Sequence, residues 1–340
     1  SSLLHFSPMP TLLSPLRFTT LHLRNRIVMP PMCSGLATPE GFVTPPIVEY
    51  HRRRAAAGCG LIIVEHTFVH ERGRHSQGQM GVHNDATIEG LGRLAAAVKA
   101  EGAAVCLQLA HAGSRGSRRV LGAAALAPSA LRHPYEPEGD VPEEMKVPQI
   151  QEVIAAFGEA AGRAAAAGFD AVEIHAAHGY LLSQFLSPLT NRRTDDYGGP
   201  LEQRARLHRE VVSSVRRRVG AHFPVFVRLG ADDETPGGLG IEDGASVAAC
   251  LADNSVNLID VSGGLQGSRG AGKGSAYFLP LAQAIRSRVG VPVLVTGGIS
   301  DAAMADEIVR EEWADLVGIG RAMLNDPDWA RQAIDQLKAS

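Results

Sequence analysis

Eight short apolar segments, each followed by a stretch with helical spacing, constrain the fold of this chain more than any other feature. The strand-like segments are Arg26–Met32, Gly60–Thr67, Ala103–Ala110, Asp170–Ala176, Val225–Ala231, Asn257–Ser262, Val291–Gly297 and Ala314–Gly320. The helical stretches are Ile47–Ala57, Ala86–Glu101, Gln149–Ala167, Leu201–Val219, Asp243–Asp253, Phe278–Val289, Asp301–Arg310 and Asp328–Leu337. Such alternation indicates parallel strands joined by right-handed crossovers.

An eightfold repeat of this unit within 340 residues predicts an α/β fold of the closed (β/α)8 TIM-barrel type. The main alternative, an open doubly wound sheet, normally carries a GxGxxG turn after its first strand. Here the chain continues Cys33-Ser34-Gly35-Leu36 instead. We therefore expect one barrel domain over residues 1–340.

Two connections between predicted strands and helices are unusually long, covering residues 112–148 and 177–200. Loops of this length in compact domains are usually functional or disordered, and in a barrel both would lie at the rim that carries active sites. Within the first of them, residues 133–147 contain three prolines and five acidic residues. That segment is interpreted either as a mobile lid or as a solvated insertion.

Net charge and cysteine usage argue against several function classes. Lys and Arg total 33 against 36 Asp and Glu, a balance without the basic excess of nucleic-acid-binding proteins. The four cysteines form no CxxC motif, so we expect reduced thiols and no zinc or iron–sulfur site. No run approaches the roughly 18 apolar residues of a membrane span. The expectation is a cytoplasmic protein without metal, nucleic-acid partner or membrane segment.

Glycines at the ends of the last two predicted strands suggest an anion site. The chain reads Thr296-Gly297-Gly298 after the seventh strand, and Gly320-Arg321 after the eighth. Glycine lets backbone N–H groups approach an anion, and a guanidinium can pair with phosphate through two hydrogen bonds. Loops after these two strands form the usual phosphate site of TIM barrels. The alternative is that these glycines serve only the steric needs of tight turns.

The fourth predicted strand ends in two imidazoles and a phenol, His175, His178 and Tyr180. Imidazoles can donate hydrogen bonds to a developing oxyanion, and a phenol can deliver a proton. A metal site is less favoured because the pair supplies only two ligands. Hydrogen-bonded packing of these side chains is the structural alternative.

Polar side chains also occur at the ends of other predicted strands: Gln108, His111, Arg228 and Cys33. A glutamine amide has a donor and an acceptor, which suits an amide-like edge such as the flavin pyrimidine. An arginine can stabilise an electron-rich ring nitrogen. Polar groups at several strand ends of one barrel predict a shared binding site.

With these residues established, the sequence resembles the Old Yellow Enzyme family of FMN-dependent ene-reductases, in its thermophilic-like branch. The resemblance covers nearly the whole chain. It is carried by LLSPLRFTTLHLRNRIVMPPMC, GLIIVE, LQLAHAGS, PSAL, VEIHAAHGYLLSQFLSPLTNRRTDDYGG, VFVRLGADD, VTGGIS and GIGRAML. The long fourth-strand motif is the most specific of these.

The resemblance implies an FMN site and a catalytic group. It assigns cofactor binding to Pro30, Met32, Cys33, His66, Gln108, Arg228, Gly297, Gly298, Gly320 and Arg321. His175 and His178 resemble the pair that binds the substrate carbonyl oxygen, with Cys33 and Tyr180 also beside the substrate. Tyr180 resembles the proton donor.

The same resemblance implies the reaction and the partners. NAD(P)H reduces FMN, and the flavin then transfers hydride to the β-carbon of an α,β-unsaturated carbonyl compound while Tyr180 protonates the α-carbon. The expected partner is a small enone or a related activated alkene, and a homo-oligomer is expected.

Two departures from the family pattern leave other reactions open. Gly35 stands where this branch commonly has a tyrosine, and His66 stands where a small residue is usual. Ketone desaturation or amine demethylation on the same scaffold is therefore an alternative. A non-redox lyase or isomerase is a further one, although no lysine suited to a Schiff base lies at a predicted strand end.

Overall fold

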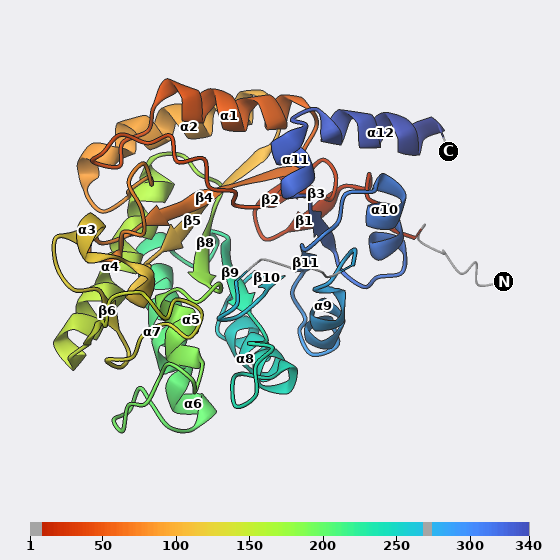
Figure 1. Cartoon of the computed structure of the whole chain (residues 1–340). Coiled ribbons are helices and arrows are strands. Elements are labelled where there is room, and N and C mark those ends of the chain that lie inside the picture. Colours follow the sequence, from red (N-terminus) through yellow and green to blue (C-terminus); the bar gives the residue numbers. More distant parts are fainter. Residues whose placement is uncertain (1–8, 268–273, 340) are drawn as a thin grey trace.

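A computed structural model describes residues 9–267 and 274–339, and within them the predicted barrel is confirmed (Figure 1). Eight parallel strands close on themselves in chain order, and the last pairs with the first. Their bounds are β3 Ile27–Met29, β4 Leu61–Phe68, β5 Ala104–Ala110, β8 Ala171–Ala176, β9 Val225–Gly230, β10 Leu258–Ser262, β11 Val293–Val295 and β12 Leu316–Gly318. Each lies inside or within one residue of a predicted segment.

The predicted helices surround this barrel, with their ends shifted by a few residues. They are α1 Pro45–Ala56, α2 Ile88–Ala100, α4 Val147–Ala166, α7 Arg206–Val219, α8 Ile241–Asp253, α9 Leu279–Arg286, α10 Ala302–Arg310 and α12 Trp329–Ala339. The stretch predicted as one helix over 201–219 is interrupted at Ala205, so that α6 (Leu201–Arg204) precedes α7. A short helix that was not predicted, α11 (Arg321–Asn325), follows β12 directly.

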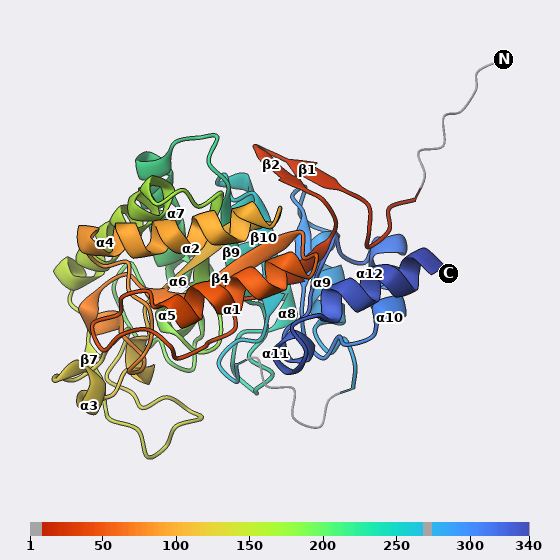
Figure 2. The ribbon, with the colours of Figure 1, turned by 90° about the horizontal axis from the view of Figure 1, so that it is seen from above.

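A hairpin that was not predicted covers one end of the barrel. Its strands are β1 (Leu16–Phe18) and β2 (Leu21–Leu23). Leu21 and Leu23 pack against the barrel interior near the N-terminal ends of its strands. The Phe18 ring lies 5.9 Å from the Phe226 ring. In Figure 2 the hairpin lies at the end of the molecule opposite the loops that carry α3 (Arg118–Leu121) and β7 (Glu143–Glu144). The hairpin therefore leaves the other rim for a site.

The two long connections carry short elements of their own. The first contains η3 (Gly113–Arg115), α3 and β6 (Leu126–Ala127), and β6 pairs with β7. The second contains α5 (Leu181–Leu186). The remaining short helices are η1 (Glu71–Gly73) and η2 (Asp85–Thr87). Among the described residues, no helix is long and apolar enough to cross a membrane.

The barrel interior is layered, because inward-facing side chains alternate along each strand. The lower layer is apolar and includes Val28, Leu61, Cys106, Phe226, Leu258, Leu294 and Leu316. Two residues further along β5, β8, β9 and β10 the interior positions are polar: Gln108, Glu173, Arg228 and Asp260. The site begins where the interior side chains change from apolar to polar.

Candidate active site

His175 and His178 come together because the chain turns sharply at the end of β8. His178 has a φ of +60°, a left-handed conformation that is strained for a residue with a side chain. Two hydrogen bonds hold it: its N–H donates to Gly263 O (3.1 Å), and its carbonyl accepts from Arg115 Nη1 (2.7 Å). The two imidazole centroids lie 4.9 Å apart, edge to face. Strain at this position is consistent with a functional role for the ring.

Tyr180 completes this group as the residue that precedes α5. Its ring is 7% exposed and lies 4.9 Å from the His175 ring. The Arg115 guanidinium carbon lies 5.5 Å from the ring centroid. The structure thus brings together the three predicted catalytic side chains, and it adds Arg115, which was not predicted. A polar residue shortly after a strand end in a long loop is the signal that could have identified it.

Burial sets the protonation of this group. Loss of solvation lowers the pKa of His175 and of His178 well below the usual value, and the positive charge of Arg228 lowers both further. Burial also raises the pKa of Tyr180 to about 12. At neutral pH the imidazoles are therefore uncharged and the phenol keeps its proton. Since His178 Nε2 lies 2.7 Å from Ser262 Oγ, its Nδ1 is the nitrogen left for another partner.

Gln108 and Arg228 lie inside the barrel below this group, both almost fully buried. Gln108 Nε2 donates to Glu173 Oε1 at 2.8 Å. Arg228 Nε lies 3.1 Å from Asp260 Oδ2, and Arg228 is paired in register with His175 on the neighbouring strand. The polar layer therefore forms the floor of the site.

Cys33, after the first barrel strand, and Glu65, on the second barrel strand, contribute a thiol and a buried carboxyl. Cys33 is exposed, and partial burial of its thiol together with the negative charge of Glu65 raises its pKa. The Glu65 carboxyl accepts hydrogen bonds from the N–H and the hydroxyl of Ser34. Burial raises the pKa of Glu65 to about 7. Glu65 was not predicted as a site residue, although it directly precedes His66.

His66 reaches the site because β4 carries a bulge between Val64 and Thr67. Its ring lies 5.6 Å from Tyr180 and 6.2 Å from His75, and burial lowers its pKa to about 3. His75, another residue that was not predicted, lies 5.4 Å from Tyr180. His111 is instead enclosed by Gly73 and the His70 ring.

The predicted anion-binding glycines adopt the expected backbone. Gly297 and Gly298 have φ values of +104° and +74°. A Cβ at Gly297 would lie 2.8 Å from the Tyr277 ring, so the turn is also packed against an aromatic side chain. Tyr277 Oη accepts a hydrogen bond from Arg321 Nη2 at 3.5 Å. Tyr277 is a further residue of this corner that was not predicted.

The first and last strands of the barrel meet beside this corner. A Cβ added to Gly320 would lie 3.2 Å from Met32 Sδ and 3.6 Å from Pro30 Cγ. Pro30, Met32 and Gly320 are therefore neighbours, as a shared site requires.

The segment 133–147 rests against the site. Glu136 pairs with Arg115 at 2.8 Å, and the Tyr135 hydroxyl hydrogen-bonds to the Thr235 hydroxyl. A Cβ at Gly179 would overlap His133 Nε2. The loop thus supports the strand end that carries the imidazoles.

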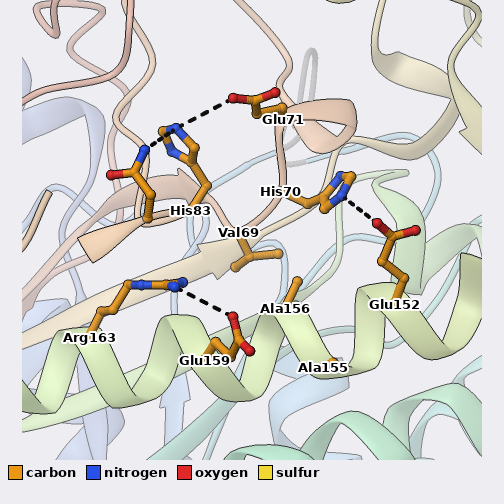
Figure 3. A pocket seen from close by; sticks show the side chains of 10 residues that line it. Val69, His70, Glu71, His83, Glu152, Ala155, Ala156, Glu159 and Arg163 are labelled. Atoms are coloured by element: carbon orange, nitrogen blue, oxygen red, sulfur yellow. Dashed lines mark hydrogen bonds and ion pairs between the residues drawn. The ribbon is translucent and has the colours of Figure 1, made fainter. Parts of the chain in front are cut away.

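A separate surface pocket of about 410 Å³ lies between the segment after β4 and helix α4 (Figure 3). Its charged groups pair with one another: His70 with Glu152, Arg163 with Glu159, and His83 with Glu71. No predicted site residue lines this pocket. In the part of the chain that the structure describes, no group of three or more His, Cys, Asp or Glu is arranged to hold a metal ion.

Comparison with known proteins identifies the family. The sequence profile of the NADH:flavin oxidoreductase / NADH oxidase family matches residues 11–340. The chain belongs to this family. It is 40% identical over 330 residues to an NADPH dehydrogenase of Bacillus pumilus, covering 97% of this chain and 96% of that protein. The predicted membership of the Old Yellow Enzyme family is confirmed.

Solved structures of this family share the fold. The old yellow enzyme homologue from Zymomonas mobilis superposes with a TM-score of 0.84 at 28% identity, covering 96% of this chain and 93% of that one. A 2-naphthoyl-CoA reductase in complex with 2-naphthoyl-CoA gives a TM-score of 0.90 at 28% identity; the match covers 96% of this chain and 52% of that one. This family member is an oxidoreductase with FMN as cofactor and NAD(P)H as donor.

The residues present fit FMN. Arg228 is a buried cation whose Nη2 has only long hydrogen bonds, of 3.3 Å to Thr296 and 3.5 Å to Ser262. Arg228 can therefore donate a further hydrogen bond to an electron-rich ring atom. At the corner of the glycine turns, exposed Arg321 supplies donors for a phosphate.

Proposed function

We propose that this protein is an ene-reductase that reduces the C=C bond of α,β-unsaturated carbonyl compounds. One observation carries the proposal: a buried phenol that keeps its proton lies beside two uncharged imidazoles at one strand end. A carbonyl oxygen needs hydrogen-bond donors as negative charge develops on it, and the adjacent carbon needs a proton. Both needs are met within this group.

The side chains divide the chemistry as follows. Bound FMN supplies the two-electron redox chemistry, with NAD(P)H as the source of electrons. Gln108 and Arg228 would hold the ring system from the barrel interior, and Gly297, Gly298, Gly320 and Arg321 would hold the phosphate. Pro30, Met32, Cys33 and His66 would border the cofactor, with Cys33 also beside the substrate.

His175 and His178 donate N–H hydrogen bonds to the substrate carbonyl oxygen. This withdraws electron density from the β-carbon and stabilises the enolate-like charge. Tyr180 gives its phenolic proton to the α-carbon. Burial of the three side chains excludes water, which strengthens each of these hydrogen bonds.

The test follows the visible spectrum of the purified protein under anaerobic conditions. NADPH or NADH should bleach the flavin, and cyclohex-2-enone should then restore its colour. A flavin that cyclohexanone reduces, and that cyclohexenone does not reoxidise, would instead assign the reverse reaction, ketone desaturation. If cyclohexenone does not reoxidise the flavin and cyclohexanone does not reduce it, both ene reduction and ketone desaturation are contradicted.

A further inference from the structure

Four buried side chains below the proposed catalytic group form a connected polar cluster. They are Gln108, Glu173, Arg228 and Asp260, on the neighbouring strands β5, β8, β9 and β10. Gln108 is paired in register with Glu173, and Arg228 with Asp260. Glu173 and Asp260 are both 0% exposed, and burial together with the negative charge of Asp260 raises the pKa of Glu173, so the two carboxyls lie within interaction range of each other. The cluster thus joins the two side chains proposed to hold the flavin ring.

The hydrogen-bond inventory of the two carboxyls is incomplete if both are ionised. Glu173 Oε1 accepts from Gln108, but Glu173 Oε2 and both oxygens of Asp260 lack an aligned donor. Ionised carboxylates only accept, so two of them cannot satisfy each other. A proton on Glu173 Oε2 turns that atom into a donor to one oxygen of Asp260, while Arg228 Nε lies 3.1 Å from Asp260 Oδ2. Buried polar groups are nearly always satisfied in this way.

Charge balance leads to the same assignment. Arg228 lies 3.1 Å from Asp260 and neutralises one carboxylate. A second buried carboxylate would leave a negative charge without a partner, which is costly in a low-dielectric interior. Burial raises the pKa of both acids, to about 6 for Asp260 and well above the usual value for Glu173. The Cys106 thiol, also fully buried beside the pair, is held neutral by a raised pKa.

We propose that Glu173 is a neutral carboxylic acid that shares its proton with Asp260 and so acts as a positioning residue for Gln108 and Arg228. With Gln108 Nε2 committed to Glu173, the amide oxygen Oε1 is left as the acceptor for a ring N–H of the flavin. Asp260 in turn keeps Arg228 in place for an electron-rich edge. The inference rests on FMN binding at the proposed site.

Two substitutions of Glu173 test this arrangement. Glu173→Gln keeps one acceptor for Gln108 and one donor to Asp260, so FMN affinity should stay within about threefold of the wild type. The reduction potential of the bound flavin should also stay unchanged. Glu173→Leu removes both hydrogen bonds and should weaken FMN binding by about tenfold or more. It should also shift the visible spectrum of the flavin.

An ionised Glu173 would behave differently. Glu173→Gln would then remove a negative charge below the flavin and favour its reduced form. A tenfold change in the ratio of oxidised to reduced flavin affinity, about 30 mV for a two-electron couple, would overturn the proposal. Equal FMN affinities for Glu173→Leu and the wild type would overturn the positioning role.

Infrared spectroscopy of the wild-type holoenzyme provides a test that needs no stable variant. The carbonyl band of a protonated carboxylic acid should be present at pH 9, where Glu65, with a pKa of about 7, is ionised. Loss of this band in Glu173→Gln at pH 9 would assign the proton to Glu173, and its persistence there would assign the proton to Asp260 and overturn the proposal. Failure of cyclohexenone to reoxidise the flavin would contradict the ene-reductase function and leave these readouts intact.

Discussion

The floor and the rim of the site are built in different ways. On the floor, Gln108, Glu173, Arg228 and Asp260 lie on regular strands, are at most 4% exposed, and find partners through strand register. At the rim, His178 depends on a left-handed backbone and on Arg115 from a loop. Substitutions on the floor should therefore lower the free energy of unfolding, whereas substitutions at the rim should lower the reaction rate.

The largest effect on stability is expected from Arg228→Leu. It leaves Asp260 buried without its counter-charge, which should cost about 3–5 kcal/mol of unfolding free energy. Urea unfolding of the FMN-free protein measures this, because Arg228 is also proposed to hold the flavin and bound FMN would add its own stabilisation. The cost should shrink at acidic pH, because a carboxyl with a raised pKa takes up a proton in the folded state and is then neutral.

The matched control is Arg119→Leu, which changes an exposed arginine in the short helix α3. Its effect should stay within about 0.5 kcal/mol. Equal costs for the two arginines would mean that the floor is no more demanding than the surface.

Tyr180→Phe should have the next largest effect, and it should be catalytic. Removing the phenolic proton should slow reoxidation of the flavin by cyclohexenone on the order of 100-fold, or about 2.7 kcal/mol of activation free energy. FMN affinity should not change. Stopped-flow absorbance measures the rate, and an unchanged rate would assign proton delivery to water or another group.

The pH dependence of the wild-type enzyme sharpens this prediction. The pKa of Tyr180 is raised to about 12 and those of His175 and His178 are lowered well below the usual value. None of the three should titrate between pH 8 and 9, and Glu65, with a pKa of about 7, is already ionised there, so the reoxidation rate should be flat in this range. A decline in this range with the form of a single ionisation would contradict the burial of the phenol.

The smallest effect is expected at the ion pair of the rim. Glu136→Gln breaks the contact with Arg115, whose side chain is 24% exposed while that of Glu136 is 34% exposed. Solvent screens such a pair, so the loss should be below about 1 kcal/mol and should fade in high salt. A loss as large as that of Arg228→Leu would remove the distinction between floor and rim.

All eight barrel strands and their main helices could be predicted from the sequence, because apolar runs such as Leu61–Val64 and helical spacing are local signals. The hairpin of β1 and β2, helix α11 and the interruption at Ala205 were not predicted. Their patterns are too short to differ from loops, and tertiary packing decides them.

Within the site, too, some residues could be predicted from the sequence and others could not. The polar residues at the strand ends were visible because they interrupt apolar strands. Arg115, His75 and Glu136 were not predicted, because only in the folded chain do Arg115 and His75 approach Tyr180 and does Glu136 pair with Arg115. The bulge that brings His66 toward Tyr180 likewise depends on pairing between β4 and β5.

The sequence by itself determined the barrel, the family and the side chains that project from the strand ends, since alternation along strands and helices is written in local residue order. Only the tertiary structure decided which of these groups lose water and which charges face each other. The neutral imidazoles, the protonated phenol and the cluster around Glu173 all follow from burial. Burial depends on residues far apart in the chain, so no local pattern encodes it.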